Sequence, residues 1–267
     1  MKKYSYVCAI TSEAYYPGVC ALAYSLKKVN AQYPLTVVVP DNAEANLFSM
    51  IKKLKLRVIT MPYVDIPVEF LNDNTPERWK HTFFKLQVFN LTEFDKIVFL
   101  DLDMIIIRNI DDLFQKSHMS AVAAGHCIHD SWTRLNSGLM VIEPSVSLYN
   151  KLIQSIPAAG EERFCENLGF GDQDVINFCF PDWWKEKDLV LPEIYNAMPS
   201  AFEKICKIYG WDNVCVIHYA ASRKPWNYTG LMMFAHIMFS VLKGNVNEAK
   251  MRYIYWCYVK KSCLEKM

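Results

Sequence analysis

Segments with the patterns of strands and of helices alternate through the first part of the chain. Residues 4–10, 35–39 and 57–60 are short apolar runs of the kind that form buried strands. The intervals near residues 15–29 and 43–54 have the apolar periodicity of helices. This β-α-β-α-β order predicts an α/β fold with a mostly parallel sheet. Ligands of such sheets bind beyond the carboxyl ends of the strands.

The rest of the chain continues the same kind of domain without a visible boundary. A helix is expected at residues 79–91 and a further strand at 139–142, whereas the last third is mixed. The chain has 267 residues, 52% of them hydrophobic, and no linker rich in Gly, Ser or Pro. We therefore expect one domain with a sizeable core, and residues 231–267 as a C-terminal helical segment packed on it.

Two carboxylates interrupt an apolar strand pattern that runs over residues 96–107. Asp101 and Asp103 are two residues apart, so on an extended chain their side chains leave the same face. An uncompensated pair of carboxylates in such a strand is costly, and a hard divalent cation removes that cost. A manganese or magnesium ion that binds a diphosphate is the usual reason for such a pair. An exposed acidic strand end is the alternative, but residues 105–107 continue the apolar run.

Charge and cysteine content argue against several classes of function. A net charge of +1 is not that of a nucleic-acid-binding protein. The nine cysteines include no Cys-x-x-Cys pair, so free thiols in a reducing compartment are expected. The chain enters a strand pattern at once, without the apolar core of a signal peptide, and residues 231–242 are too short to span a bilayer. These observations predict a cytoplasmic protein without a transmembrane segment.

Several short motifs follow one another in a characteristic order. They are residues 10–15 (ITSEAY), Lys85, residues 99–103 (FLDLD), 135–138 (LNSG), 171–174 (GDQD), 191–196 (LPEIYN) and 216–227 (VIHYAASRKPWN). This series resembles the glycogenin-like retaining glycosyltransferases, glycosyltransferase family 8, over residues 4–228. The resemblance implies one Rossmann-like nucleotide-sugar-binding domain of the GT-A type over residues 1–230, with a mixed, mostly parallel central sheet.

The resemblance also implies a metal site. In the family, the two aspartates of an Asp-x-Asp motif and a histidine near the C-terminus hold manganese, and here these are Asp101, Asp103 and His218. A shell of oxygen and imidazole ligands suits Mn²⁺, and Mg²⁺ is the second choice. Lys224 then fits a contact to the diphosphate of a UDP-sugar. A core histidine and a solvated surface lysine are the alternatives for His218 and Lys224.

Other residues are assigned by the resemblance to the donor and to catalysis. Asp172 and Gln173 match the element that faces the sugar and the reacting carbon, and Lys85 matches a lysine that contacts the donor sugar. These three are the expected catalytic residues, although Gly-Asp-Gln is also a common helix start and a lone helical lysine is ordinary. The remaining expected donor-binding residues are Ala9, Thr11, Ser12, Tyr15, Arg78, Leu102, Asn136, Ser137 and Ala221.

The reaction implied is transfer of a hexose, with glucose expected, from a UDP-sugar to an acceptor hydroxyl with retention of anomeric configuration. The acceptor stays open, as does the route, which is either a covalent intermediate or front-face attack. Gly169 stands where the family has another sugar-contacting aspartate. UDP-galactose or UDP-N-acetylglucosamine, with an inositol, glycan or protein acceptor, is therefore one alternative. A non-catalytic UDP-sugar-binding scaffold is the other.

Two expectations concern self-modification and assembly. Residues 197–207 contain no tyrosine, so attachment of sugar to the protein itself is not expected there. Residues 251–258 are aromatic, which fits either packing on the domain or pairing of two chains into a homodimer.

Overall fold

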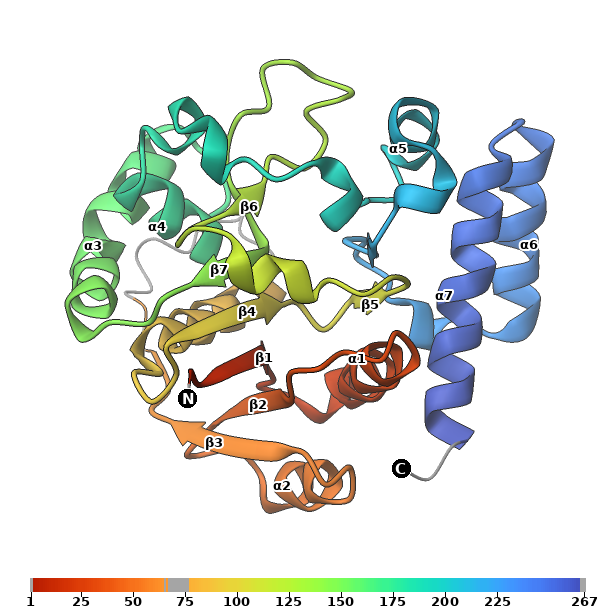
Figure 1. The fold of residues 1–267 in the computed structure, drawn as a ribbon. Helices are drawn as coiled ribbons and strands as arrows, with labels where there is room; N and C mark the ends of the chain where they lie inside the picture. Colours follow the sequence, from red (N-terminus) through yellow and green to blue (C-terminus); the bar gives the residue numbers. More distant parts are fainter. Residues whose placement is uncertain (1, 65, 67–76, 265–267) are drawn as a thin grey trace.

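The computed structural model describes residues 2–64, 66 and 77–264, without the side chains of residues 77, 78, 263 and 264. Its centre is a six-stranded sheet with the strand order β3-β2-β1-β4-β7-β6 (Figure 1). The strands are β1 (Tyr4–Ala9), β2 (Leu35–Pro40), β3 (Arg57–Met61), β4 (Lys96–Leu100), β6 (Ala121–Val122) and β7 (Asn136–Ile142). Strands β1 to β4 are parallel, whereas β7 is antiparallel to β4 and to β6. The predicted α/β fold with a mixed, mostly parallel central sheet is confirmed.

Helices cover both faces of this sheet (Figure 1). On one face, α1 (Tyr16–Lys28) and α2 (Ala45–Lys52) pack around Tyr6 of β1. On the other face, η3 (Glu77–Asn90), α3 (Val146–Cys165) and α4 (Asp172–Cys179) pack around Val7. Successive side chains of a strand point to opposite faces, so the apolar run of β1 supplies both cores. The helix expected at residues 79–91 is present as the 3₁₀ helix η3.

The apolar run over residues 96–107 is not one strand. It forms β4 and β5 (Met104–Ile106), and a turn at residues 101–103 separates them, in which the N–H of Met104 donates to the carbonyl of Asp101 at 3.1 Å. Strand β5 leaves the central sheet and pairs antiparallel with β8 (Val216–His218) in a second sheet. The prediction of a continuous extended strand was therefore wrong, and a turn, not strand alternation, sets the relation of the two aspartates.

The C-terminal part adds α5 (Phe202–Tyr209), α6 (Gly230–Leu242) and α7 (Val246–Leu264), of which α7 packs against α1. Figure 1 shows α7 between α1 and α6. A third core joins Ala21 of α1, Ile205 of α5 and Tyr255 of α7. Short 3₁₀ helices complete the described part: η1 (Glu13–Tyr15), η4 (Asp111–Gln115), η5 (Trp183–Lys185), η6 (Lys187–Leu189), η7 (Glu193–Tyr195), η8 (Trp211–Asn213) and η9 (Pro225–Asn227). Among the described residues, no helix is both long enough and apolar enough to cross a bilayer.

Candidate active site

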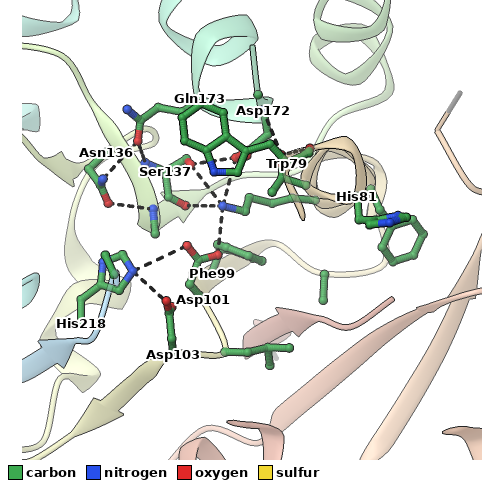
Figure 2. Close-up of a pocket in the computed structure, with 18 of the residues that line it drawn as sticks. Trp79, His81, Phe99, Asp101, Asp103, Asn136, Ser137, Asp172, Gln173 and His218 are labelled. Atoms are coloured by element: carbon green, nitrogen blue, oxygen red, sulfur yellow. Dashed lines mark hydrogen bonds and ion pairs between the residues drawn. The ribbon is translucent and has the colours of Figure 1, made fainter. Parts of the chain in front are cut away.

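A cavity of about 540 Å³ lies at the carboxyl ends of β1 and β4 (Figure 2). Its walls come from η3, β7, the start of α4 and the loops that follow β1, β4 and β8. All predicted site residues except Arg78 line it: Ala9, Thr11, Ser12, Tyr15, Lys85, Asp101, Leu102, Asp103, Asn136, Ser137, Asp172, Gln173, His218, Ala221 and Lys224. The side chain of Arg78 lies outside the described residues, so its donor contact stays a prediction.

The three expected metal ligands lie together. Asp101, Asp103 and His218 each offer one ligand atom, and these atoms are within 4.8 Å of one another. Nε2 of His218 is 3.2 Å from Oδ1 of Asp103 and 3.9 Å from Oδ2 of Asp101. The pairing of Met104 with His218 in the second sheet brings the histidine to the turn. Gly138 leaves room for it, because a Cβ there would lie 2.6 Å from Cε1 of His218.

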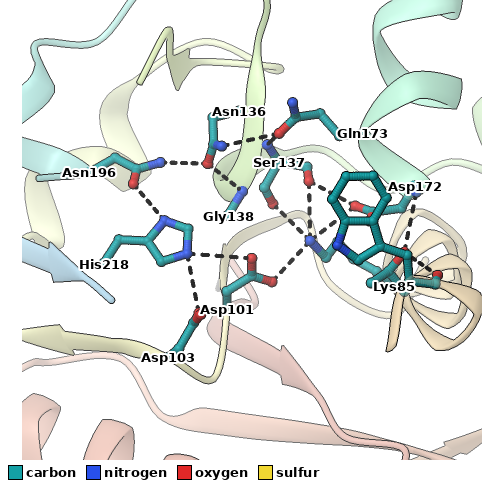
Figure 3. Close-up of polar contacts among 12 residues, drawn as sticks. Lys85, Asp101, Asp103, Asn136, Ser137, Gly138, Asp172, Gln173, Asn196 and His218 are labelled. Carbon is teal, nitrogen blue, oxygen red and sulfur yellow. Dashed lines mark hydrogen bonds and ion pairs between the residues drawn. The ribbon is translucent and has the colours of Figure 1, made fainter. Parts of the chain in front are cut away.

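A chain of hydrogen bonds determines which nitrogen of His218 faces the carboxylates (Figure 3). The backbone N–H of Gly138 donates to Oδ1 of Asn136 at 3.1 Å, and Nδ2 of Asn196 donates to the same oxygen at 2.8 Å. Oδ1 of Asn196 therefore faces Nδ1 of His218, 2.7 Å away, and accepts its proton. In the neutral imidazole the lone pair is then on Nε2, the atom that a metal would bind. The residues present fit a divalent cation with oxygen and nitrogen ligands.

We expect Asn196→Ala to weaken Mn²⁺ binding by about 10–100-fold, the usual effect of losing the partner of a ligating histidine. The substitution removes the acceptor for Nδ1–H of His218 and leaves Asn136 without one of its donors. Calorimetric titration of the purified protein with Mn²⁺ measures the change. Asn213→Ala, at an exposed asparagine, is the control. Equal Mn²⁺ affinity in Asn196→Ala and the wild type would contradict the role given to Asn196.

Lys224 faces the three expected metal ligands from the loop after β8, and we call Asp101, Asp103 and His218 the metal group. Its Nζ donates to Oδ2 of Asp103 at 2.5 Å, and Asp103 is buried. Burial by itself raises the pKa of Asp103, but His218 and Lys224 outweigh it and hold this pKa below its ordinary value. Asp103 is therefore a carboxylate at neutral pH, and a cation binds it without first displacing a proton.

Lys85 is a buried cation between two carboxylates (Figure 3). Its Nζ lies 2.9 Å from Oδ1 of Asp101 and 3.0 Å from Oδ2 of Asp172, and it donates to Oγ of Ser137 at 3.1 Å. Burial lowers the pKa of Lys85, but the two carboxylates outweigh it and raise this pKa above its ordinary value. Burial raises the pKa of Asp101, and Lys85 opposes that rise. Lys85 thus joins the metal group to the expected catalytic carboxylate.

The start of α4 brings Asp172 and Gln173 to the cavity wall. Oγ of Ser137 donates to Oδ2 of Asp172 at 2.7 Å. The backbone N–H of Ser137 and Nδ2 of Asn136 both donate to Oε1 of Gln173, each at 3.1 Å. Gly171 is the N-cap residue of α4, so the same segment starts a helix and lines the cavity. The two interpretations of Gly-Asp-Gln from sequence are compatible.

Another part of the cavity wall is formed by four of the expected donor-binding residues, Ala9, Thr11, Ser12 and Tyr15. The ring of Tyr15 meets that of Trp226 edge-on, with the ring centroids 6.0 Å apart. At Gly18 of α1, a Cβ would lie 2.5 Å from the carbonyl oxygen of Leu102. Glycine therefore allows α1 to approach the turn that carries Asp101 and Asp103.

Sequence reasoning missed several residues in or directly behind the wall of this cavity. Asn196 ends the motif at residues 191–196, but its contact with Asn136 joins positions 60 residues apart and leaves no local signal. Asp174 ends another motif and pairs with Arg134 at 2.8 Å and with Arg163 at 3.2 Å. The two arginines lie in separate segments that meet only in the folded chain, so no pattern in the sequence marked them.

Comparison with known proteins places these features in a family. The sequence model of glycosyl transferase family 8 matches residues 7–130 and 128–230. An uncharacterized protein of Acanthamoeba polyphaga mimivirus is 30% identical over 244 residues, which cover 85% of this chain and 84% of that protein. Glycogenin-1 of Oryctolagus cuniculus is 30% identical over 237 residues, which cover 86% of this chain and 67% of that protein. Inositol phosphorylceramide glucuronosyltransferase 1 of Arabidopsis thaliana is 27% identical over 246 residues, which cover 85% of this chain and 43% of that protein.

The structure is also similar to that of the galactosyltransferase LgtC in complex with donor and acceptor sugar analogs. The TM-score is 0.63 at 18% sequence identity, and the match covers 90% of this chain and 95% of the other. The fold is of the GT-A type, and the protein is a glycosyltransferase. The chain belongs to glycosyl transferase family 8.

Proposed function

We propose that this glycosyltransferase moves a hexose, with glucose as the first candidate, from a UDP-sugar to an acceptor hydroxyl with retention of configuration. The observation that carries the proposal is the meeting of Asp101, Asp103 and His218 in a cavity that also holds Lys85 and Asp172. Mn²⁺ is the proposed ion, because an imidazole ligand favours it over Mg²⁺. A divalent cation bound there would neutralise charge on the diphosphate leaving group.

Two lysines support this chemistry from opposite sides of the metal group. The ammonium of Lys224, at Oδ2 of Asp103, is close to where a metal-bound diphosphate would lie. Its charge would offset the negative charge that develops on UDP as the bond to the sugar breaks. Lys85 holds Asp101 and Asp172 at fixed positions relative to each other, which supplies the orientation that transfer requires.

Asp172 is the proposed carboxylate next to the reacting carbon. Among the described carboxylates that line the cavity, it is the one that belongs neither to the metal group nor to the arginine pair at Asp174. Contacts from Lys85 and Ser137 fix its Oδ2. A fixed carboxylate serves as the nucleophile of a covalent route. In a front-face route, it stabilises positive charge on the sugar while the leaving phosphate takes the acceptor's proton.

UDP release from a panel of donors, with Mn²⁺ and with a chelator, tests the proposal. The panel contains UDP-glucose, UDP-galactose, UDP-N-acetylglucosamine and UDP-glucuronate, because the similar proteins include a glucuronosyltransferase and a galactosyltransferase by name. Manganese-dependent release, fastest with UDP-glucose, is expected. Faster release from a different donor would change the proposed sugar and leave the proposed transfer reaction unchanged. Donor binding by calorimetry without release, also in the presence of glycan, inositol and protein acceptors, would favour the non-catalytic UDP-sugar-binding alternative.

The intact mass of the protein is expected to stay unchanged after incubation with UDP-glucose and Mn²⁺. Tyr15 is the only tyrosine among the described residues that line the cavity, and it is one of the expected donor-binding residues. The hydroxyl of Tyr195 donates to Asp112 at 2.6 Å, outside the cavity. Mass spectrometry of the intact chain measures the outcome. A ladder of hexose additions would show that the protein modifies itself.

The acceptor of the proposed reaction is an unidentified glycan, protein or small molecule. Cytoplasmic location and pairing into a homodimer stay predictions, as does the division at residue 230. None of the three is needed for the proposed reaction.

A further inference from the structure

The outward side of α6 is apolar. Leu231, Phe234, Phe239 and Leu242 are 79%, 60%, 56% and 81% exposed, and Met238 and Val241 are exposed beside them. The buried positions of α6 include Ser240, so the helix does not follow the usual rule of apolar side inward and polar side outward. Such an apolar surface on a protein commonly marks an interaction site. We call Leu231, Phe234, Met238, Phe239, Val241 and Leu242 the α6 face.

The position of α6 explains why the fold leaves this face uncovered. Helix α7 lies between α1 and α6, so α6 is the outermost helix on this side of the molecule (Figure 1). Met233 of α6 packs into the core that contains Met251 and Tyr255 of α7. No described element lies over the opposite side of α6, because its residues there are exposed to solvent.

Basic side chains lie near both ends of the α6 face. Residues 219–264 contain seven Lys or Arg and a single acidic residue, Glu248, in a chain whose net charge is +1. Glu248 pairs with Arg252 at 2.6 Å. At the end of α6, Nζ of Lys243 lies 4.3 Å from the ring centroid of Phe239. At its start, Lys260 lies over the ring of Trp256, which neighbours Gly230.

We propose that the α6 face is a docking surface for an anionic lipid bilayer, on which α6 lies in the plane of the headgroups. An apolar helix face with basic residues at its margins has the two attractions that such binding requires. The 13 residues of α6 are too few to span a bilayer. A second copy of the chain is a poorer occupant, because a two-fold axis would bring the basic margins of both copies together. The inference is independent of the proposed transfer reaction.

Sedimentation of the full chain with vesicles tests this proposal. The vesicles contain phosphatidylcholine alone or phosphatidylcholine with phosphatidylserine. Binding is expected only with phosphatidylserine, and added NaCl should weaken it. The combined variant Phe234→Gln, Phe239→Gln and Leu242→Gln should lower the partition coefficient at least about tenfold. The double variant Lys243→Gln with Lys260→Gln should also lower the partition coefficient.

A matched control replaces three apolar side chains of similar exposure elsewhere, in Val146→Gln, Phe164→Gln and Ile208→Gln, which are 53%, 54% and 54% exposed. This variant should bind vesicles as the wild type does. Circular dichroism checks that every variant is folded, independently of enzymatic activity. Absent vesicle binding, equal binding to uncharged vesicles, or equal binding by the α6 variant would overturn the proposal. Light scattering that shows a dimer, dissociated by the α6 variant, would instead assign the face to a second copy.

Discussion

Replacing Asp103 by alanine is expected to lower manganese-dependent release of UDP by at least about 1,000-fold. The side chain is a proposed metal ligand, and it also receives Nζ of Lys224 and faces Nε2 of His218. Its loss removes one of three ligands and leaves the ammonium of Lys224 without its partner where a cation must bind, so metal affinity and turnover fall together. Initial rates over a series of Mn²⁺ concentrations measure the effect.

Asp212→Ala is the control for this substitution, because the side chain of Asp212 is 97% exposed and lies outside the cavity. It should retain wild-type turnover. The Asp103→Ala protein should still unfold cooperatively, since the three hydrophobic cores do not include this residue. Wild-type turnover in folded Asp103→Ala would refute the metal site.

Replacing Lys85 by methionine is expected to lower the free energy of unfolding by about 3–5 kcal/mol, the usual cost of removing one partner of a buried ion pair. Lys85 is 8% exposed and compensates two carboxylates, Asp101 and Asp172, which would then repel each other. Methionine keeps most of the volume of the side chain, so packing changes little. Urea unfolding of the metal-free protein, followed by circular dichroism, measures the change.

The double variant Lys85→Met with Asp172→Asn separates charge from packing. It removes one positive and one negative charge, so it should be more stable than Lys85→Met alone. Both variants should lose turnover, because each lacks a residue that the proposed reaction uses. Equal stability of the single and the double variant would show that Lys85 acts through packing and not through its charge.

The α/β fold and its mostly parallel sheet were predictable because they depend on local patterns. Alternation of short β-branched runs with helical periodicity fixes which segments form strands, and the crossover rule makes them parallel. The family resemblance also grouped most of the residues that line the cavity, although their functions stay predictions. The turn at residues 101–103 was not predictable, because β5 is diverted by its pairing with β8, far along the chain.

Two other features depended on contacts that only the folded chain makes. The tautomer of His218 follows from hydrogen bonds among Asn136, Asn196 and a backbone N–H, each supplied by a different position of the sequence. Residues 231–242 were expected to form a packed helix, and α6 does pack against α7. Nothing in their composition showed that most of the apolar side chains would face solvent, because α7 occupies the position between α6 and α1.

The pairing of β5 with β8 also determines when a growing chain acquires the proposed cation site. Asp103 and Lys224 are 121 positions apart, and His218 precedes Lys224 by only a few residues. A ribosome releases the aspartates long before it releases the histidine and the second lysine. Nascent or truncated chains that end before residue 218 therefore contain the carboxylates without their nitrogen ligand. Newly made protein can therefore assemble the proposed site only after residue 218 has left the ribosome.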